Sequence, residues 1–207
     1  SDAMQWLYNE TTAIKTYDNR TVNSIYFDDV DFSSVRDNLA GIAQRNKLRL
    51  RWYGNQKNSL PIFEVKTKNG RLGYKTTYPI QSIENSLMKL NIDKITSKCI
   101  SGLEEQNIVF DKHLVPTLQV NYEREYYETH DGIRITIDQD IQFSDAQLHT
   151  MLDENNSFPY PFKVMEIKFK PSMKNPVAKL MQSLHITPKR HSKYLVGLSM
   201  LGYAVYI

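Results

Sequence analysis

Four segments of this chain alternate strictly between charged and apolar residues, and this alternation constrains the fold more than any other feature of the sequence. The segments are residues 47–52, 63–68, 133–141 and 164–170. Side chains two residues apart share one face of a β-strand, so each segment would separate its charges from its apolar groups. The pattern predicts an antiparallel sheet with a polar side and an apolar side.

The polar faces of these four segments are mainly basic, and three of them also carry an isolated acid. Their charged residues are Lys47, Arg49, Arg51, Glu64, Lys66, Lys68, Arg134, Asp138, Glu166, Lys168 and Lys170. One such strand alone is best explained by ordinary exposure to solvent. Four together favour a barrel with helices outside and a polyanion inside, because arginine forks bind two phosphate oxygens at once. The isolated acids would hold a divalent cation that bridges phosphate oxygens.

The rest of the sequence predicts an antiparallel α+β domain, because strand pairs and groups of helices follow one another without βαβ alternation. Asn69-Gly70 and Asp131-Gly132 fit the tight turns of two hairpins. Strands are predicted at residues 22–27, 46–53, 61–68, 71–80, 117–129, 133–143 and 164–170. Helices are predicted at residues 33–44, 82–90, 95–106, 175–185 and 191–201.

Composition favours one domain and a local basic site. A chain of 207 residues supports a single core, and its net charge of only +3 means that any basic site is local. Residues 1–3 read as an expression-tag remnant, which leaves residues 4–207 as the domain. Cys99 is the single cysteine, so a reducing, cytoplasmic location is expected. The apolar residues 194–207 are shorter than the about 20 that a spanning helix needs, and they predict a buried core segment.

Several other polar clusters have a simpler explanation than a functional site. Asp28, Asp29 and Asp31 directly follow a predicted strand, which indicates turn and helix-start residues rather than a metal cluster. The five histidines do not show the spacing of a zinc site. Cys99 is expected to be a small buried residue.

Seven short motifs, spread in order from Val22 to Tyr194, resemble those of the VTC-type polyphosphate polymerase domain. They are V-N-S-x-Y-F-D at 22–28, K-x-R-x-R-x-Y-G at 47–54, E-x-K at 64–66, Y-x-R at 122–124, R-x-T-x-D at 134–138, E-x-K at 166–168 and S-K-Y at 192–194. Each motif alone is weak. Their shared order over most of the chain makes the resemblance specific.

The resemblance implies an eight-stranded antiparallel β-barrel, the triphosphate tunnel shared with CYTH-type triphosphatases. It implies a metal-dependent enzyme that transfers the γ-phosphate of ATP to a growing inorganic polyphosphate chain, with Mn²⁺ or Mg²⁺ as cofactor. Glu166 would bind the metal. The implied catalytic residues are Arg49, Arg51, Lys66 and Arg134, and the expected further phosphate contacts are Lys47, Lys75, Arg124, Lys168 and Lys193.

The sequence departs from the family in one respect and leaves the reaction open. Family members begin with an E-R-K strand, which residues 4–20 lack, so the tunnel is expected to miss its first strand. A tripolyphosphate or nucleoside triphosphatase of the same fold, and a non-catalytic polyphosphate-binding module, remain alternatives. The expected partners are ATP and polyphosphate rather than nucleic acid. A membrane protein at the cytoplasmic face is a further expected partner, although no span is expected in this chain.

Overall fold

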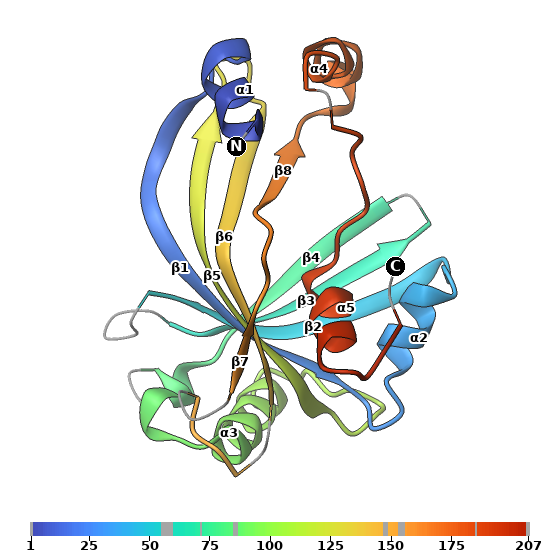
Figure 1. Ribbon diagram of the computed structural model, residues 1–207. Coiled ribbons are helices and arrows are strands. Elements are labelled where there is room, and N and C mark those ends of the chain that lie inside the picture. Colours follow the sequence, from blue (N-terminus) through green and yellow to red (C-terminus); the bar gives the residue numbers. More distant parts are fainter. Residues whose placement is uncertain are drawn as a thin grey trace. The chain divides into compact units, whose positions relative to one another are not determined.

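The computed structural model describes residues 2–54, 60–70, 72–84, 87–146, 149–152, 156–184 and 186–205 (Figure 1). The helices are α1 (Asp2–Glu10), α2 (Ser33–Leu39), α3 (Ile92–Glu104), α4 (Lys174–Met181) and α5 (Lys193–Met200). The strands are β1 (Ile14–Asp28), β2 (Gln44–Tyr53), β3 (Ile62–Asn69), β4 (Leu72–Pro79), β5 (Val115–Glu128), β6 (Arg134–Asp145), β7 (Ser157–Pro159) and β8 (Val164–Lys168). Short 3₁₀ helices are η1 (Gln81–Ile83), η2 (Leu87–Lys89) and η3 (Pro171–Met173).

All of these strands belong to one sheet, in the order β4-β3-β2-β1-β5-β6-β7, with β8 paired to β6. Besides β5, β6 has two further antiparallel partners: Arg134 to Asp138 pair with β8, and Gln142 to Ser144 pair with β7. The predicted α+β fold with an eight-stranded antiparallel sheet is confirmed. Within the described ranges no ladder joins β4 to β7 or β8, so closure into a barrel stays a prediction.

The chain divides into two compact units, each with its own core. The smaller unit comprises Ser1–Arg20, Tyr122–Ile141 and Pro161–His191. The larger unit comprises Thr21–Asn121, Gln142–Tyr160 and Ser192–Ile207. The long strands β1, β5 and β6 contribute residues to both units, so the division follows packing rather than the ends of elements.

The core of the larger unit is built on the apolar face predicted for β2. Leu48, Leu50 and Trp52 are buried there with Phe63 of β3. Burial of each such side chain stabilises the fold by about 1.5–3 kcal/mol. Because side chains alternate along a strand, the same pairing places the charged residues of β2 on the opposite face.

Helix α3 covers this core with an apolar stripe. Asn91 caps its N-terminus by accepting a hydrogen bond from the Lys94 amide at 3.0 Å. Ile95, Cys99 and Leu103 recur every four residues, and all three are buried in the core. Burial raises the pKa of the Cys99 thiol to about 12, which confirms the expectation of a buried residue and leaves it unreactive at neutral pH.

Asp28, the last residue of β1, and Asp29 hold the start of α2, as the sequence predicts. Asp29 accepts hydrogen bonds from the amides of Asp31 at 3.2 Å and Ser33 at 2.9 Å. Asp28 accepts from the amides of Ser34 at 3.0 Å and Val35 at 3.3 Å. These carboxylates therefore satisfy amides that the first helical turn would leave without partners.

The smaller unit has a separate core on the apolar face of β6. Ile135 and Ile137 pack there with Trp6 of α1 and Val177 of α4. Ile167 of β8 packs against the same cluster. The alternation predicted for residues 133–141 is thus confirmed, and that predicted for residues 164–170 is confirmed only as far as Lys168. Phe169, predicted on the apolar face, is exposed, and β6 and β8 pair in register over Arg134 to Asp138.

Several element boundaries differ from those predicted. β1 begins eight residues before Val22. Residues 14–20 are all exposed, so no alternation of buried and exposed side chains indicates a strand there. Residues 82–90 hold η1 and η2 instead of one helix, because Glu84 has extended backbone angles. The strand predicted at 164–170 ends at Lys168, and α2 ends at Leu39. Predicted residues 71, 85–86 and 185 lie outside the described ranges, and α1 and β7 were not predicted.

The apolar C-terminal segment is only partly buried. Tyr194 and Leu198 of α5 are buried, whereas Tyr203 and Val205 are exposed, so the prediction of a core segment is wrong for these last two residues. Residues 206–207 of the predicted segment lie outside the described ranges. Among the described residues, no helix has both the length and the apolar character that crossing a membrane requires.

We expect Gly197→Ala to destabilise the protein by about 1–2 kcal/mol despite the better helix propensity of alanine. A Cβ atom at this position of α5 would lie 2.6 Å from side-chain atoms of both Leu118 and Phe143. Urea denaturation would measure the loss. Gly73→Ala is the control, because its Cβ would meet only the Thr67 carbonyl oxygen at 3.6 Å. Equal stability of the two variants would contradict close packing of α5 on β5 and β6.

Candidate functional site

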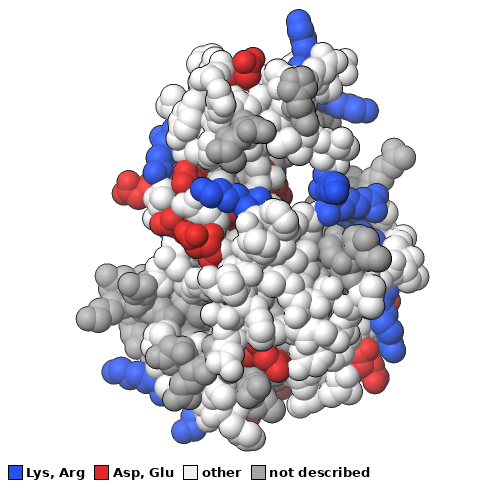
Figure 2. All heavy atoms as spheres, viewed as in Figure 1, with Lys and Arg blue, Asp and Glu red and all other residues white. Residues whose placement is uncertain are grey.

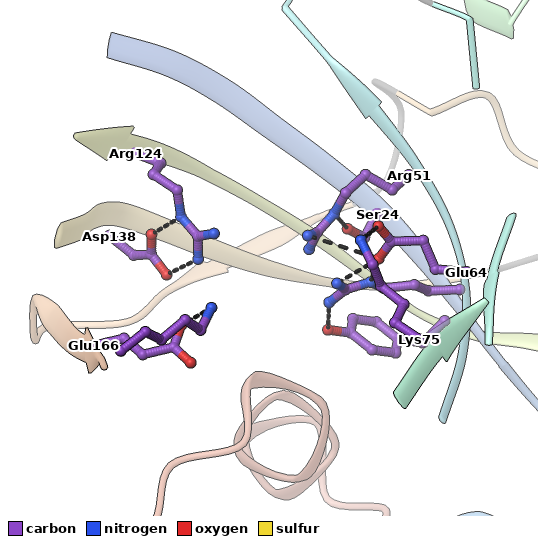
Figure 3. A network of polar contacts seen from close by, with 10 residues as sticks. Ser24, Arg51, Glu64, Lys75, Arg124, Asp138 and Glu166 are labelled. Carbon is purple, nitrogen blue, oxygen red and sulfur yellow. Dashed lines mark hydrogen bonds and ion pairs between the residues drawn. The ribbon is translucent and has the colours of Figure 1, made fainter. Parts of the chain in front are cut away.

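The charged face of β2 in the larger unit is organised around the buried carboxylate of Glu64. Its Oε2 lies 2.5 Å from Nη2 of Arg49 and 3.9 Å from Nη1 of Arg51, and its Oε1 lies 2.8 Å from Nζ of Lys75 (Figure 3). Burial raises the pKa of Glu64, but the charges of Arg49 and Arg51 outweigh this and lower it to about 2. One permanent anion therefore fixes three cations, and an excess of positive charge remains for a ligand.

Tyr26 and Ser24 of β1 complete this cluster on the same face. The Tyr26 hydroxyl accepts a hydrogen bond from Nη1 of Arg49 at 3.1 Å, and the Ser24 hydroxyl accepts from Nε of Arg51 at 3.2 Å. The antiparallel register places Tyr26 opposite Arg49 and Ser24 opposite Arg51. Burial raises the pKa of Tyr26, but the nearby charges of Arg49, Arg51 and Lys193 lower it overall.

Three lysines form a row across β2, β3 and β4, at the position two residues along β3 from Glu64. Lys47, Lys66 and Lys75 are direct partners in the registers of β2 with β3 and of β3 with β4. Like charges opposite one another destabilise a sheet. The repulsion within this row would be relieved by a bound anion, so the row is a second indication of an anion site.

The S-K-Y motif at residues 192–194 attaches α5 to this face. The Ser192 hydroxyl caps the helix by accepting from the Leu195 amide at 3.4 Å, and it also accepts from Nζ of Lys47 at 2.8 Å. The ring of Tyr194 stacks on Tyr26, with 4.9 Å between ring centroids and 11° between their planes. These contacts hold Lys193, the first residue of α5, beside the cationic strands.

The buried hydroxyl of Tyr194 ties α5 to β1. It donates a hydrogen bond to Oδ2 of Asp28 at 2.9 Å, and it lies 3.2 Å from the Thr117 hydroxyl. Burial and the charge of Asp28 raise the pKa of Tyr194 above its usual range. Tyr194 therefore stays protonated and remains a donor at physiological pH.

The smaller unit contains a separate polar cluster on β5 and β6. Nε and Nη2 of Arg124 donate to the two carboxylate oxygens of Asp138 at 2.5 and 2.8 Å (Figure 3). The Arg124 guanidinium carbon also lies 5.2 Å from the Tyr122 ring centroid. Burial lowers the pKa of Arg124, but the hydrogen bonds to Asp138 raise it well above its usual range. This bidentate ion pair fixes the orientation of the guanidinium group.

Glu166 lies near these residues on β8, opposite Thr136 of β6. Its Oε2 is 3.1 Å from Nζ of Lys168, and its side chain is 47% exposed. Lys168 in turn pairs in register with Arg134, another direct opposition of like charges. The described residues hold no group of three His, Cys, Asp or Glu side chains around one point. A single accessible carboxylate still suits Mg²⁺ or Mn²⁺ when phosphate oxygens and water complete the coordination.

The structure thus groups the predicted site residues into two sets. The larger unit brings together Lys47, Arg49, Arg51, Lys66, Lys75 and Lys193. The smaller unit brings together Arg124, Arg134, Glu166 and Lys168. On the face shown in Figure 2, Lys and Arg side chains form several separate groups mixed with acidic ones, as expected when the basic sites are local.

Two residues of these faces escaped the sequence analysis. Tyr26 lies in a motif that was recognised, but its contact with Arg49 follows only from the register of β1 with β2. Arg20 lies in the unpredicted first half of β1, where its guanidinium carbon is 5.1 Å from the Tyr17 ring centroid and 5.8 Å from that of Tyr126.

Lys47 titrates well below an ordinary lysine. Burial is the main cause that lowers its pKa from 10.5 to about 8. The charges of Lys66, Arg45 and Arg49 contribute to this lowering, against an opposing effect of Tyr26. Between these two pH values the unfolded chain therefore holds more protons at Lys47 than the folded chain does.

We expect the free energy of unfolding of the wild type to rise, relative to Lys47→Gln, as the pH increases from 8 to 10.5. One titrating group limits the slope of this difference to about 1.4 kcal/mol per pH unit. Urea denaturation at a series of pH values measures it. Lys98→Gln, on the exposed side of α3, is the control and should follow the wild type. A difference that stays constant across the window would contradict the lowered pKa.

Two solved structures share the fold of this chain. The PH1819 protein of Pyrococcus horikoshii OT3 aligns with a TM-score of 0.54 and 14% identity, over 98% of this chain and 93% of that one. A putative adenylyl cyclase from Hippeastrum, described as having a dominant triphosphatase activity, aligns with a TM-score of 0.54 and 14% identity, over 96% and 90%. At this identity the likeness establishes the fold alone.

Sequence comparison identifies the family. Vacuolar transporter chaperone complex subunit 2 of Saccharomyces cerevisiae is 26% identical over an alignment of 233 residues. The match covers 86% of this chain and 28% of that protein. The chain therefore spans little more than a quarter of this relative. The model of the VTC domain family matches residues 2–202. The chain belongs to the VTC domain family, as its seven motifs indicate.

Proposed function

We propose that this chain is a metal-dependent polyphosphate polymerase domain, which transfers the γ-phosphate of ATP to a growing inorganic polyphosphate chain. The observation that carries the proposal is the Glu64 cluster, in which a buried carboxylate holds Arg49, Arg51 and Lys75 in place yet leaves the cations in excess. Cations fixed before the ligand arrives favour a polyanion, because little further ordering is needed on binding.

Phosphoryl transfer requires the protein to neutralise charge and to align the reactants more than to form covalent bonds with them. Phosphoryl transfer passes through a loose transition state whose charge is spread over the phosphoryl oxygens. Arg49 and Arg51 would hold the triphosphate through their planar forks, and Arg124 and Arg134 are proposed as further phosphate ligands. The acceptor is a phosphate oxygen that is already anionic at neutral pH, so no strong protein base is required. Water in the acceptor position would give hydrolysis.

The lysines are proposed as further ligands that lower the charge of the bound anion. Lys66 is assigned to the reacting triphosphate together with the arginines, and the remaining lysines to substrate binding. These substrate-binding lysines are Lys47, Lys75, Lys168 and Lys193. Their partial exposure leaves them accessible to a ligand, as the 50% and 51% exposed side chains of Lys75 and Lys168 illustrate.

Glu166 is proposed as the protein ligand of Mn²⁺ or Mg²⁺. Such an ion, when bound, would neutralise negative charge on the phosphate. The accessible carboxylate fits this role, and Lys168 at 3.1 Å would compensate Glu166 while the site is free of metal. Glu64 and Asp138 fit it less well, because their oxygens already accept from Arg49, Lys75 and Arg124.

Two alternative functions use the same groups. A tripolyphosphate or nucleoside triphosphatase is favoured by the fold shared with the Hippeastrum protein, whose described activity is that of a triphosphatase. A non-catalytic polyphosphate-binding module is favoured by the yeast relative, which is named as one subunit of a complex. Incubation with ATP and Mn²⁺ separates the three outcomes: long chains on a stained gel, orthophosphate release, or neither.

The name of the yeast relative also motivates a proposal about partners. We infer that this domain works within an assembly that includes a membrane protein, at the cytoplasmic face of a membrane. Co-purification of the full-length protein with membrane fractions would test this location separately from activity.

We expect Arg49→Ala and Arg134→Ala each to lower kcat/KM for ATP by at least about 100-fold, because each removes a cation that is proposed to bind a substrate phosphate. Initial rates of polyphosphate formation measure the effect, and circular dichroism checks folding. Arg36→Ala, on the exposed side of α2, is the matched control and should be unaffected. Polyphosphate synthesis at the wild-type rate by either site variant would refute its assignment.

We expect Glu166→Gln to raise the Mn²⁺ concentration needed for half-maximal activity by about tenfold, because the amide loses the charge that attracts the cation. Metal titrations at saturating ATP measure the shift. Glu105→Gln, just after α3, serves as the control for loss of a carboxylate. An unaltered metal requirement would exclude Glu166 as a ligand.

A further inference from the structure

The larger unit contains a cavity that the proposed function does not use. Its volume is about 430 Å³, which is within the range typical of sites for small molecules. Residues of β1, β2, β5 and β6 form its wall, and Met88 of η2 and Leu152 supply apolar surface. Every described residue that lines the cavity belongs to the larger unit, so the cavity is formed within that unit.

On β1 and β2 the cavity lies mainly on the face opposite to the arginines. Trp52 in its wall packs with Leu50 in the core, and Arg51 between them lies on the other face of β2. Asn23 of β1 is paired with Trp52 in register and also lines the cavity. Its neighbour Ser24 borders the cavity, but the Ser24 hydroxyl is held by Arg51. The cavity is therefore a different site from the arginine cluster.

On β5 and β6 the cavity lies on the face that points away from α5. The side chains of Leu118 and Phe143 approach α5 closely, because a Cβ atom at Gly197 would lie 2.6 Å from both. Gln119 and Gln142 are their neighbours along the strands, so alternation places them on the opposite face, where they line the cavity. Helix α5 stacks on the arginine side of β1, which agrees with the position of the cavity on β2.

The wall of this cavity is polar but uncharged. Hydroxyl groups of serine and threonine contribute to it, and no Asp, Glu, Lys, Arg or His is among the described residues that line it. A charged ligand would lose its hydration there without compensation, so the wall favours an uncharged ligand. Four carboxamides supply most of its hydrogen-bonding groups: Asn23, Gln119, Asn121 and Gln142.

Some of these hydrogen-bonding groups are not used by the protein. Nε2 of Gln119 and Nε1 of Trp52 are buried donors without a partner among the described residues. The side chain of Gln142 makes no hydrogen bond in the same ranges. Buried donors without partners are rare in folded proteins. A ligand that supplies acceptors would satisfy them, with the Gln119 side chain turning toward the cavity as the ligand binds.

A carboxamide presents a donor beside an acceptor, which matches the edge of a nucleobase. Glutamine and asparagine pair with adenine in this bidentate way. We propose that the cavity is a binding site for an uncharged nucleoside of the adenosine type, whose base is contacted by Gln119 and Gln142. Met88 and Leu152 would cover the flat ring. The inference goes beyond the proposed function, because the cavity lacks the cations that a triphosphate needs.

The test is titration of the ¹⁵N-labelled protein with adenosine, which carries no phosphate. The chain has two tryptophans, and Trp6→Phe identifies which indole N–H signal belongs to Trp52. We expect adenosine to shift the Trp52 signal, also in the presence of excess tripolyphosphate. The Trp6 signal should stay, because its Nε1 already donates to Ser183 at 3.0 Å. An unshifted Trp52 signal at the solubility limit of adenosine, or an equal shift with glucose, would overturn the proposal.

Two isosteric variants test the carboxamides. We expect Gln119→Met and Gln142→Met each to weaken adenosine binding by about tenfold, as loss of one hydrogen bond predicts. Gln44→Met, on an exposed residue outside the cavity wall, should match the wild type. Gln119→Met should also keep or raise the midpoint of thermal unfolding, because it removes a buried donor without a partner. Wild-type affinity in both variants would refute the site.

Polyphosphate synthesis from ATP separates this inference from the proposed function. Both variants should synthesise polyphosphate at the wild-type rate, because the arginine cluster lies on the other face of the sheet. A loss of synthesis in proportion to the loss of adenosine affinity would mean that the cavity holds the base of the substrate, which would overturn a separate site. Absence of synthesis in the wild type, with the Trp52 shift intact, would overturn only the proposed function.

Discussion

The structure of the larger unit depends on one buried carboxylate. Glu64 is 4% exposed and accepts hydrogen bonds from Arg49 and Lys75, so its charge survives burial only because cations surround it. Removing one partner of a buried pair typically costs about 3–5 kcal/mol, since the other charge is left without compensation. The reverse also holds: without Glu64, the cations of β2 and β4 would repel one another. The carboxylate is therefore a structural counter-ion that makes a dense cationic face compatible with folding.

The alternation of charged and apolar residues along the strands made much of this arrangement predictable. Once residues 47–52 and 63–68 were recognised as strands, the separation of charged and apolar faces on each strand followed from alternation, and the register that pairs Arg49 with Glu64 brings the charged faces together. The Asn69-Gly70 turn then fixed the register of β3 with β4, with Gly70 at a positive φ of 59°, and so paired Lys66 with Lys75. The turn and the alternation of side chains can be read from the sequence because each involves only a few neighbouring residues.

Other features could not be predicted because they arise from contacts between distant segments. Residues 14–20 of β1 are exposed throughout, so no burial pattern marks them as a strand. Glu84 has extended backbone angles and interrupts residues 82–90, which were predicted as one helix. The roles within the S-K-Y motif were likewise hidden, since Tyr194 finds Asp28 at a separation of 166 residues.

This distant contact explains why a motif near the end of the chain can matter to a site built on its first strands. Tyr194 stacks on Tyr26, and the Tyr26 hydroxyl accepts from Arg49, so α5 and the arginine are joined through two rings. Ser192 makes a second link by accepting from Lys47. Because both links end on cations of β2, displacement of α5 would release side chains on which phosphate binding is proposed to depend. The order of the cationic face is thus a property of the packed unit rather than of any one strand.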